Sequence, residues 1–151
     1  MRKIANNITA EFRSLCPVAT GLDIIGDKWT LLILRDMIWG HKTLFSEFKE
    51  SPEQMPSKML SNRLKKLEDF GFISQKAGVT NKKSVYYLME EKGIDTFPIM
   101  IEMAIFTSKH FFDYLGHTYT KEARSVMIKN RKEYISDLVK QYKNFKKKLV
   151  L

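Results

Sequence analysis

The chain has 151 residues, a net charge of +9, and 44% apolar and 12% aromatic residues. This composition excludes a disordered chain and is sufficient for one domain with a core of its own. The basic excess favours a polyanionic partner, usually a nucleic acid, and the alternative is a basic protein without such a partner. Most of the excess lies from residue 120 onward, where ten Lys or Arg face three Asp or Glu.

Cys16 is the single cysteine, which excludes an intramolecular disulfide and fits a reducing compartment. No apolar run is long enough to span a membrane, and the polar N-terminus lacks a signal-peptide core. We therefore expect a cytoplasmic protein that does not contact membranes.

Two helices are predicted before residue 41. The first begins near Pro17 and ends at Gly26, and the second follows Asp27, which is placed to cap it, and ends at Gly40. The second helix should be largely buried, because it carries a wide apolar stripe. This stripe consists of Trp29, Leu32, Ile33, Leu34 and Met37. A short strand at 42–44 and a brief helix at 45–50 are predicted next.

Residues 57–70 predict an amphipathic helix. Leu60, Leu64 and Leu67 are spaced by four and three residues, so they share one face. The outward edge is polar and basic and carries no carboxylate: Ser57, Lys58, Ser61, Asn62 and Lys65. Such an edge suits a DNA major groove, because Asn pairs with adenine and Lys with guanine or phosphate. The alternative is an ordinary solvated face.

Residues 72–76 and 84–88 predict a hairpin whose turn carries Asn81, Lys82 and Lys83. A basic hairpin that directly follows a helix-turn-helix predicts a wing, with these three residues on the DNA backbone or in the minor groove. We expect Lys42 to touch a phosphate. Arg63 lies nearer the buried edge, where it either clamps a phosphate, which we favour, or forms an ion pair with Glu68 or another acid.

From Gly93 onward the sequence predicts a long helix with Pro98 in its first turn, followed by a basic helix over 121–148. The apolar stripe of this last helix should have little core of its own chain to cover, so we expect it to pack on a partner subunit. The predicted fold is thus one mainly helical domain with a small β-hairpin. Residues 15–93 form a winged helix-turn-helix core, and residues 94–151 form dimerisation helices.

Four segments resemble the HxlR-type winged-helix transcriptional regulators, which are related to the MarR group. They are residues 16–18 (CPV), 22–35 (LDIIGDKWTLLILR), 58–71 (KMLSNRLKKLEDFG) and 87–93 (YLMEEKG). The resemblance implies a homodimer on double-stranded DNA, with residues 57–70 as recognition helix, residues 76–85 as wing, and outer helices that build the dimer. A dimer would bind an inverted repeat with its recognition helices about 34 Å apart. The last helix is longer than in typical members, so the resemblance assigns it no role.

The resemblance also implies that Cys16 senses oxidants or electrophiles, since several members use a cysteine near the N-terminus. The interpretation that we favour is a small buried apolar residue, because free cysteines are commonly buried. The aromatic stretch 106–119 either lines an effector pocket between subunits or belongs to the dimer core.

Other classes of function have little support in the sequence. His41, His110 and His117 are scattered, so no metal site is expected, and no phosphate loop or nucleophile motif is present. We therefore expect neither an enzyme nor a cofactor. A winged helix that binds only another protein remains an alternative, but it should present an apolar edge over 57–65.

Overall fold

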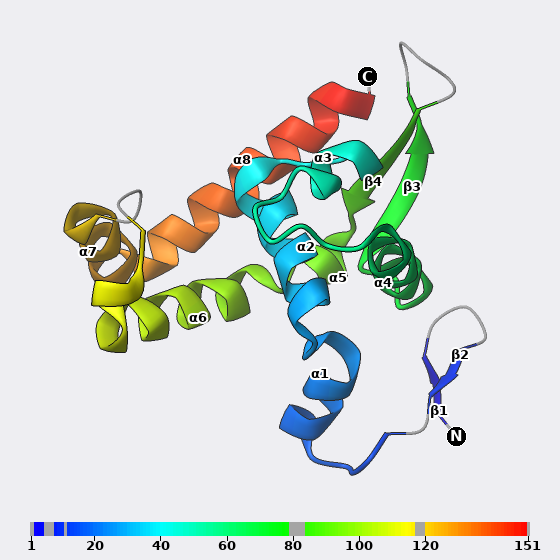
Figure 1. Cartoon of the computed structure of the whole chain (residues 1–151), viewed down its shortest axis with the longest axis horizontal. Helices are drawn as coiled ribbons and strands as arrows, with labels where there is room; N and C mark the ends of the chain where they lie inside the picture. The colour runs from blue at the N-terminus through cyan, green and yellow to red at the C-terminus, as the bar shows by residue number, and fades with distance from the viewer. Residues whose placement is uncertain (1, 5–7, 11, 79–83, 117–119, 151) are drawn as a thin grey trace.

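The structure is a computed structural model that describes residues 2–4, 8–10, 12–78, 84–116 and 120–150. Helices dominate the fold, which confirms the predicted class, and two antiparallel strand pairs accompany them (Figure 1). The β1–β2 pair was not predicted. The elements are β1 (Arg2–Ile4), β2 (Ile8–Ala10), α1 (Pro17–Ile25), α2 (Lys28–Gly40), α3 (Phe45–Lys49), α4 (Ser57–Asp69), β3 (Ile73–Ala77), β4 (Val85–Met89), α5 (Glu91–Ile94), α6 (Phe97–His110), the 3-10 turn η1 (Phe112–Tyr114), α7 (Lys121–Lys129) and α8 (Arg131–Val150).

Helix α2 is the central support of the fold. Asp27 caps it as predicted, because a side-chain oxygen accepts a hydrogen bond from the Thr30 amide at 3.1 Å. The apolar stripe is rotated from the predicted one, so that Trp29 and Leu32 are only half-buried. The most buried apolar side chains of α2 are Ile33, Leu34, Met37 and Ile38. They share one core with the leucines of α4 and with Phe48 of α3; α3 and α4 are the helix-turn-helix pair, in which α4 packs on α2 and α3 packs on α4.

The β3–β4 hairpin follows α4 through a tight turn at Gly71. This glycine has φ of 72°, a left-handed conformation that glycine adopts without a steric cost. The strands pair from Ile73–Met89 at the base to Ala77–Val85 near the tip. The predicted strand at 42–44 does not form, although the Thr43 carbonyl accepts a hydrogen bond from the Tyr87 amide at 2.8 Å, on the free edge of β4.

The C-terminal region differs from the prediction in two ways. The basic segment forms two helices, α7 and α8, which meet at Asn130. The expectation that its apolar stripe would find little of its own chain to cover is wrong. Tyr142 is fully buried, and Met127 and Leu138 are 4% and 8% exposed in the same core as α2 and α6. Figure 1 shows α8 running from α7 past α2 until its end lies beside β4.

Among the described residues, no helix is both long and apolar enough to cross a membrane.

Candidate nucleic-acid interface

The outward edge of α4 is exposed, and its inward edge is buried. Leu60, Leu64 and Leu67 have exposed fractions of 2% or less, as their spacing predicts. The five polar positions that were expected to face DNA are all exposed: Ser57, Lys58, Ser61, Asn62 and Lys65. Lys65 pairs with Asp69 one turn further along, at 3.3 Å, and its side chain remains 75% exposed. An exposed pair of this kind is weak, so Lys65 can exchange it for a phosphate.

Two basic side chains of α4 anchor this helix to the end of α1 and the start of α2. The Arg63 Nε donates to Asp27 Oδ1 at 2.8 Å, and Lys66 Nζ donates to the Asp23 carbonyl at 3.1 Å. Burial acts to raise the pKa of Asp27, but hydrogen bonds from Thr30 and Arg63 outweigh it, so this pKa lies below its usual range. For Arg63 the structure shows the ion pair with another acid, and the phosphate clamp stays a prediction.

Lys42 belongs to a network of charged side chains at the C-terminal half of α2. Its ammonium lies 2.9 Å from Asp36 Oδ2 and 2.7 Å from Ser51 Oγ. Arg35 bonds both Asp36 and Glu53, and its hydrogen bond lowers the pKa of Glu53 to about 2. The network ties α2 to the α3–α4 loop. The structure thus gives Lys42 an internal role, and its phosphate contact stays a prediction.

The β3–β4 hairpin is joined to α4 by a side-chain hydrogen bond. The Gln75 side-chain amide donates to the Glu68 carboxylate at 2.8 Å, which fixes β3 against the last turn of α4. Lys76 is exposed on β3 and was not singled out as a site residue, because the sequence pattern does not reveal which strand face is free. The predicted tip residues Asn81, Lys82 and Lys83 lie outside the described residues.

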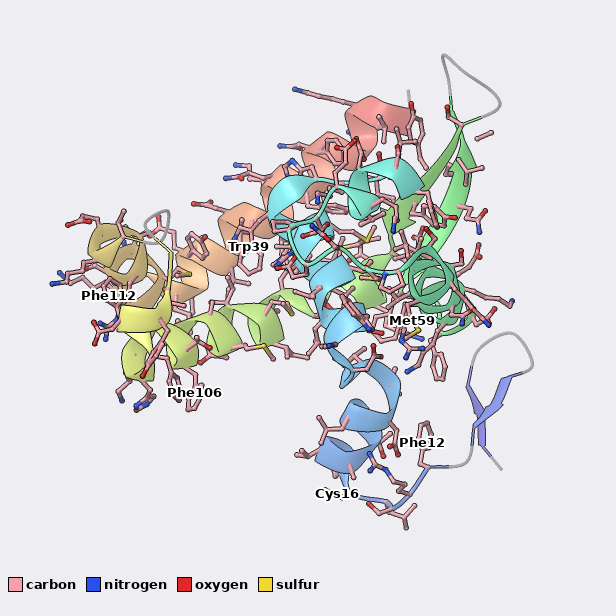
Figure 2. All side chains as sticks on the ribbon, in the orientation of Figure 1. Phe12, Cys16, Trp39, Met59, Phe106 and Phe112 are labelled. Carbon is pink, nitrogen blue, oxygen red and sulfur yellow. The ribbon has the colours of Figure 1, made fainter. Side chains whose placement is uncertain are left out.

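Cys16 is exposed, so the expectation of a buried side chain is wrong. It is the residue that precedes α1, and Figure 2 shows it at the far end of that helix, away from α4. The position of Cys16 at the start of the first helix was predicted correctly. Sequence periodicity, however, does not show whether other residues cover a side chain at the end of a helix. Over the described ranges, no group of three or more His, Cys, Asp or Glu is arranged to hold a metal ion.

Comparisons with known proteins identify the fold. The HxlR-like helix-turn-helix family matches residues 24–113, from the end of α1 to η1, which is more than half of the chain. The chain belongs to the HxlR-like helix-turn-helix family. This confirms the family and the class of DNA-binding transcriptional regulator to which the sequence was assigned. Helices α7 and α8 lie beyond the matched region.

Two curated relatives and one solved structure illustrate the likeness. The uncharacterized HTH-type transcriptional regulator YdeP of Bacillus subtilis (strain 168) is 31% identical over 109 residues, which cover 72% of this chain and 84% of YdeP. YybR of the same organism, described in the same words, is 33% identical over 88 residues, or 58% and 70% of the two chains. The redox regulator HypR in its oxidized form has 28% identity and a TM-score of 0.55, over 63% of this HxlR-like chain and 97% of HypR.

Proposed function

We propose that this HxlR-like regulator binds an inverted-repeat operator as a homodimer, with α4 in the major groove and the wing beside it. The observation that carries the proposal is the edge of α4, which is polar, basic, exposed and free of carboxylates from Ser57 to Lys65. An apolar edge would suit a protein partner better, and this edge is not apolar.

The contacts divide into two kinds. Asn62 and Lys58 are our candidates for base edges, because an amide reads adenine and an ammonium reads guanine. Ser57, Ser61 and Lys65 have shorter or more mobile groups suited to phosphate oxygens, which position the protein without specifying sequence. Lys76 and the wing tip Asn81, Lys82 and Lys83 add backbone contacts. Arg63 acts mainly by holding α4 on Asp27.

Two exposed apolar stripes support the homodimer. On and just before α1, Leu15, Val18 and Leu22 are 99%, 70% and 56% exposed. On α6, a second stripe consists of Ile99, Met103 and Phe106, which are 47%, 44% and 59% exposed. Figure 2 shows Phe106 on the same side of α6 as α1. Contiguous exposed apolar side chains mark interaction sites, so we assign the two stripes to the interface between copies of the chain.

The experiment has two steps. The purified protein first selects bound fragments from random DNA, and gel shifts then measure its affinity for the consensus. Asn62→Ala and Lys58→Ala should each weaken operator binding by about 1–3 kcal/mol when they remove a bidentate base contact. Lys140→Ala, which removes an exposed lysine of α8 in place of one of α4, is the matched control. Unchanged binding by both α4 variants would refute the proposal.

A second candidate function is thiol-based sensing through Cys16, which an exposed thiol permits. The likeness to HypR, described as a redox regulator, favours the same idea. Because the chain has one cysteine, the oxidised form would be a disulfide between subunits or with a small thiol. Diamide should then change operator affinity of the wild type and leave Cys16→Ser unaffected. An equal response of both proteins would exclude this role.

A further inference from the structure

A hollow of about 700 Å³ lies where the C-terminal helices meet α2 and α6. We call it the C-terminal hollow; its apolar wall is made by Trp39, Ala104, Ala123, Val126, Met127 and Tyr134. Figure 2 shows Trp39 on the side of α2 that faces α6–α8. The volume lies in the range of small-molecule sites, which are typically concave and mainly apolar. Two of its walls, α7 and α8, lie beyond the part of the chain that matches the family.

The hollow is separate from the surface assigned to the second subunit. None of the residues that line it belongs to the α1 or α6 stripe. Met103 of the α6 stripe instead lines a neighbouring hollow of about 560 Å³, so a partner subunit would reach that hollow first. The two hollows share Arg35, Trp39 and Ala104, whereas Val126, Met127 and Tyr134 line the C-terminal hollow and not its neighbour. The C-terminal hollow can thus remain open to a small molecule in the dimer.

Electrostatics and hydrogen bonding define the class of ligand. Arg35 and Asp36 both line the hollow, and the Arg35 guanidinium is already paired with Asp36 and Glu53, so the local charge is balanced. A charged ligand would lose its hydration without gaining a free counter-charge. The Trp39 indole donates to the Tyr134 hydroxyl at 3.3 Å, and a phenol that accepts can also donate to a ligand oxygen. These features fit an uncharged aromatic molecule with a hydrogen-bonding oxygen.

Helix α8 joins the hollow to the wing. Tyr134 lines the hollow, and Tyr142 lies eight residues later on the same helix, about 12 Å along its axis. The Tyr142 hydroxyl accepts a hydrogen bond from the Met89 amide at 2.8 Å, and Lys146 Nζ donates to the Met89 carbonyl at 2.6 Å. They lie on the same free edge of β4 as the hydrogen bond from the Tyr87 amide to the Thr43 carbonyl. A displacement of α8 therefore reaches the base of the wing directly.

We propose that the C-terminal hollow is an effector site for an uncharged aromatic molecule, and that α8 transmits its occupancy to the wing and so to operator affinity. The regulatory half of this proposal rests on the proposed function, whereas the binding half does not. Tyr142 acts as a positioning residue, since it holds the base of the wing and touches neither the ligand nor the DNA.

The binding half is tested by ¹⁹F NMR of protein labelled with 5-fluorotryptophan. The chain has two tryptophans, and Trp29 does not line the hollow, so it is an internal control. The probe 2-naphthol should shift the Trp39 resonance in a saturable way and leave Trp29 in place. The charged analogues 2-naphthoate and 2-naphthylmethylammonium should bind more weakly. Val126→Phe, which fills the hollow, should abolish the shift.

Ile128→Phe is the matched control, because Ile128 is on the same helix, is 44% exposed against 52% for Val126, and does not line the hollow. It should retain the shift. No saturable shift of Trp39, or a shift that survives Val126→Phe, would overturn the site. Equal affinity for a charged analogue would overturn the ligand class. Trp39 also lines the neighbouring hollow, so a second copy there could shift it as well. A Trp39 shift that appears on raising protein concentration alone and is abolished by Val126→Phe would assign the C-terminal hollow to a second copy of the chain, against the proposal.

The regulatory half is tested on the selected operator. Saturating 2-naphthol should change the operator affinity of the wild type by at least about fivefold, the lower end of ordinary allosteric coupling. Tyr142→Phe should still bind the probe and should lose this response. Unchanged operator affinity in a saturated wild type would overturn the coupling. Failure of the unliganded protein to bind any operator would refute the proposed function and leave the NMR result intact.

Discussion

Replacing Tyr142 with Phe removes one hydroxyl from the most buried contact between α8 and the wing. The ring can stay in place, because it packs against Phe97 and Phe145 at centroid distances of 5.9 Å each. The Met89 amide, however, loses its acceptor, and Met89 is fully buried. A buried donor without a partner costs about 1–3 kcal/mol, so the free energy of unfolding should fall by that amount.

Urea unfolding monitored by circular dichroism measures this loss, with an unchanged m-value as evidence that the denatured state is the same. Tyr134→Phe is the control, because its hydroxyl accepts a longer bond of 3.3 Å on a partly exposed side chain. It should cost less than Tyr142→Phe. Equal stability of Tyr142→Phe and the wild type would refute the idea that this hydroxyl secures the edge of β4.

The same hydroxyl predicts a dependence on pH. Burial raises the pKa of Tyr142 to about 12, and the Glu90 carboxylate acts in the same direction. Above the ordinary tyrosine pKa of about 10, the unfolded chain loses this proton while the folded chain keeps it. The stabilisation is therefore complete below about pH 10 and is lost as the pH rises toward 12. The difference in stability between the wild type and Tyr142→Phe should shrink over this interval.

Three further predictions concern other parts of the molecule. Asp27→Ala should lower the free energy of unfolding by about 1–2 kcal/mol through the lost cap, and Asp27→Asn by less, because asparagine still caps a helix. Since folding lowers the pKa of Asp27, the destabilisation by Asp27→Ala should diminish as the pH falls through that pKa. Phe106→Glu should shift the mass in sedimentation toward the monomer without loss of helix signal, whereas Ile128→Glu should not; a dimeric Phe106→Glu would remove the α6 stripe from the interface. Cys16 should react with Ellman's reagent in the native protein at the rate of a free thiol, and protection would place it in a contact.

The sequence predicts local structure best where the deciding residues are close together in the chain and one side of the element is clearly apolar. The burial of the α4 leucines follows from their spacing alone. The Asp27 cap and the place of Pro98 in the first turn of α6 follow from the residue types at the start of each helix. The polar edge opposite the leucines is exposed for the same reason. In each case, the residues that decide the outcome lie within a few positions of one another.

Contacts between distant segments could not be predicted in the same way. The stripe of α8 is apparent in the sequence, but its periodicity does not distinguish the edge of β4 from a second subunit. For Arg63 the favoured prediction was a phosphate clamp and the alternative an ion pair with Glu68 or another acid; the acid that it meets, Asp27, is 36 residues away. Lys42 lies beside Asp36 and Ser51 because α2 and the α3–α4 loop converge, which only the tertiary fold determines.

The salt dependence of operator binding tests the central claim most directly. If the basic edge of α4 contacts the DNA backbone, the logarithm of the binding constant should fall steeply with the logarithm of salt concentration. Lys65→Ala should reduce this slope by about one and weaken binding to operator and random DNA alike, whereas Asn62→Ala should keep the slope and lose discrimination between them. A flat salt dependence in the wild type, or full discrimination in Asn62→Ala, would contradict the account.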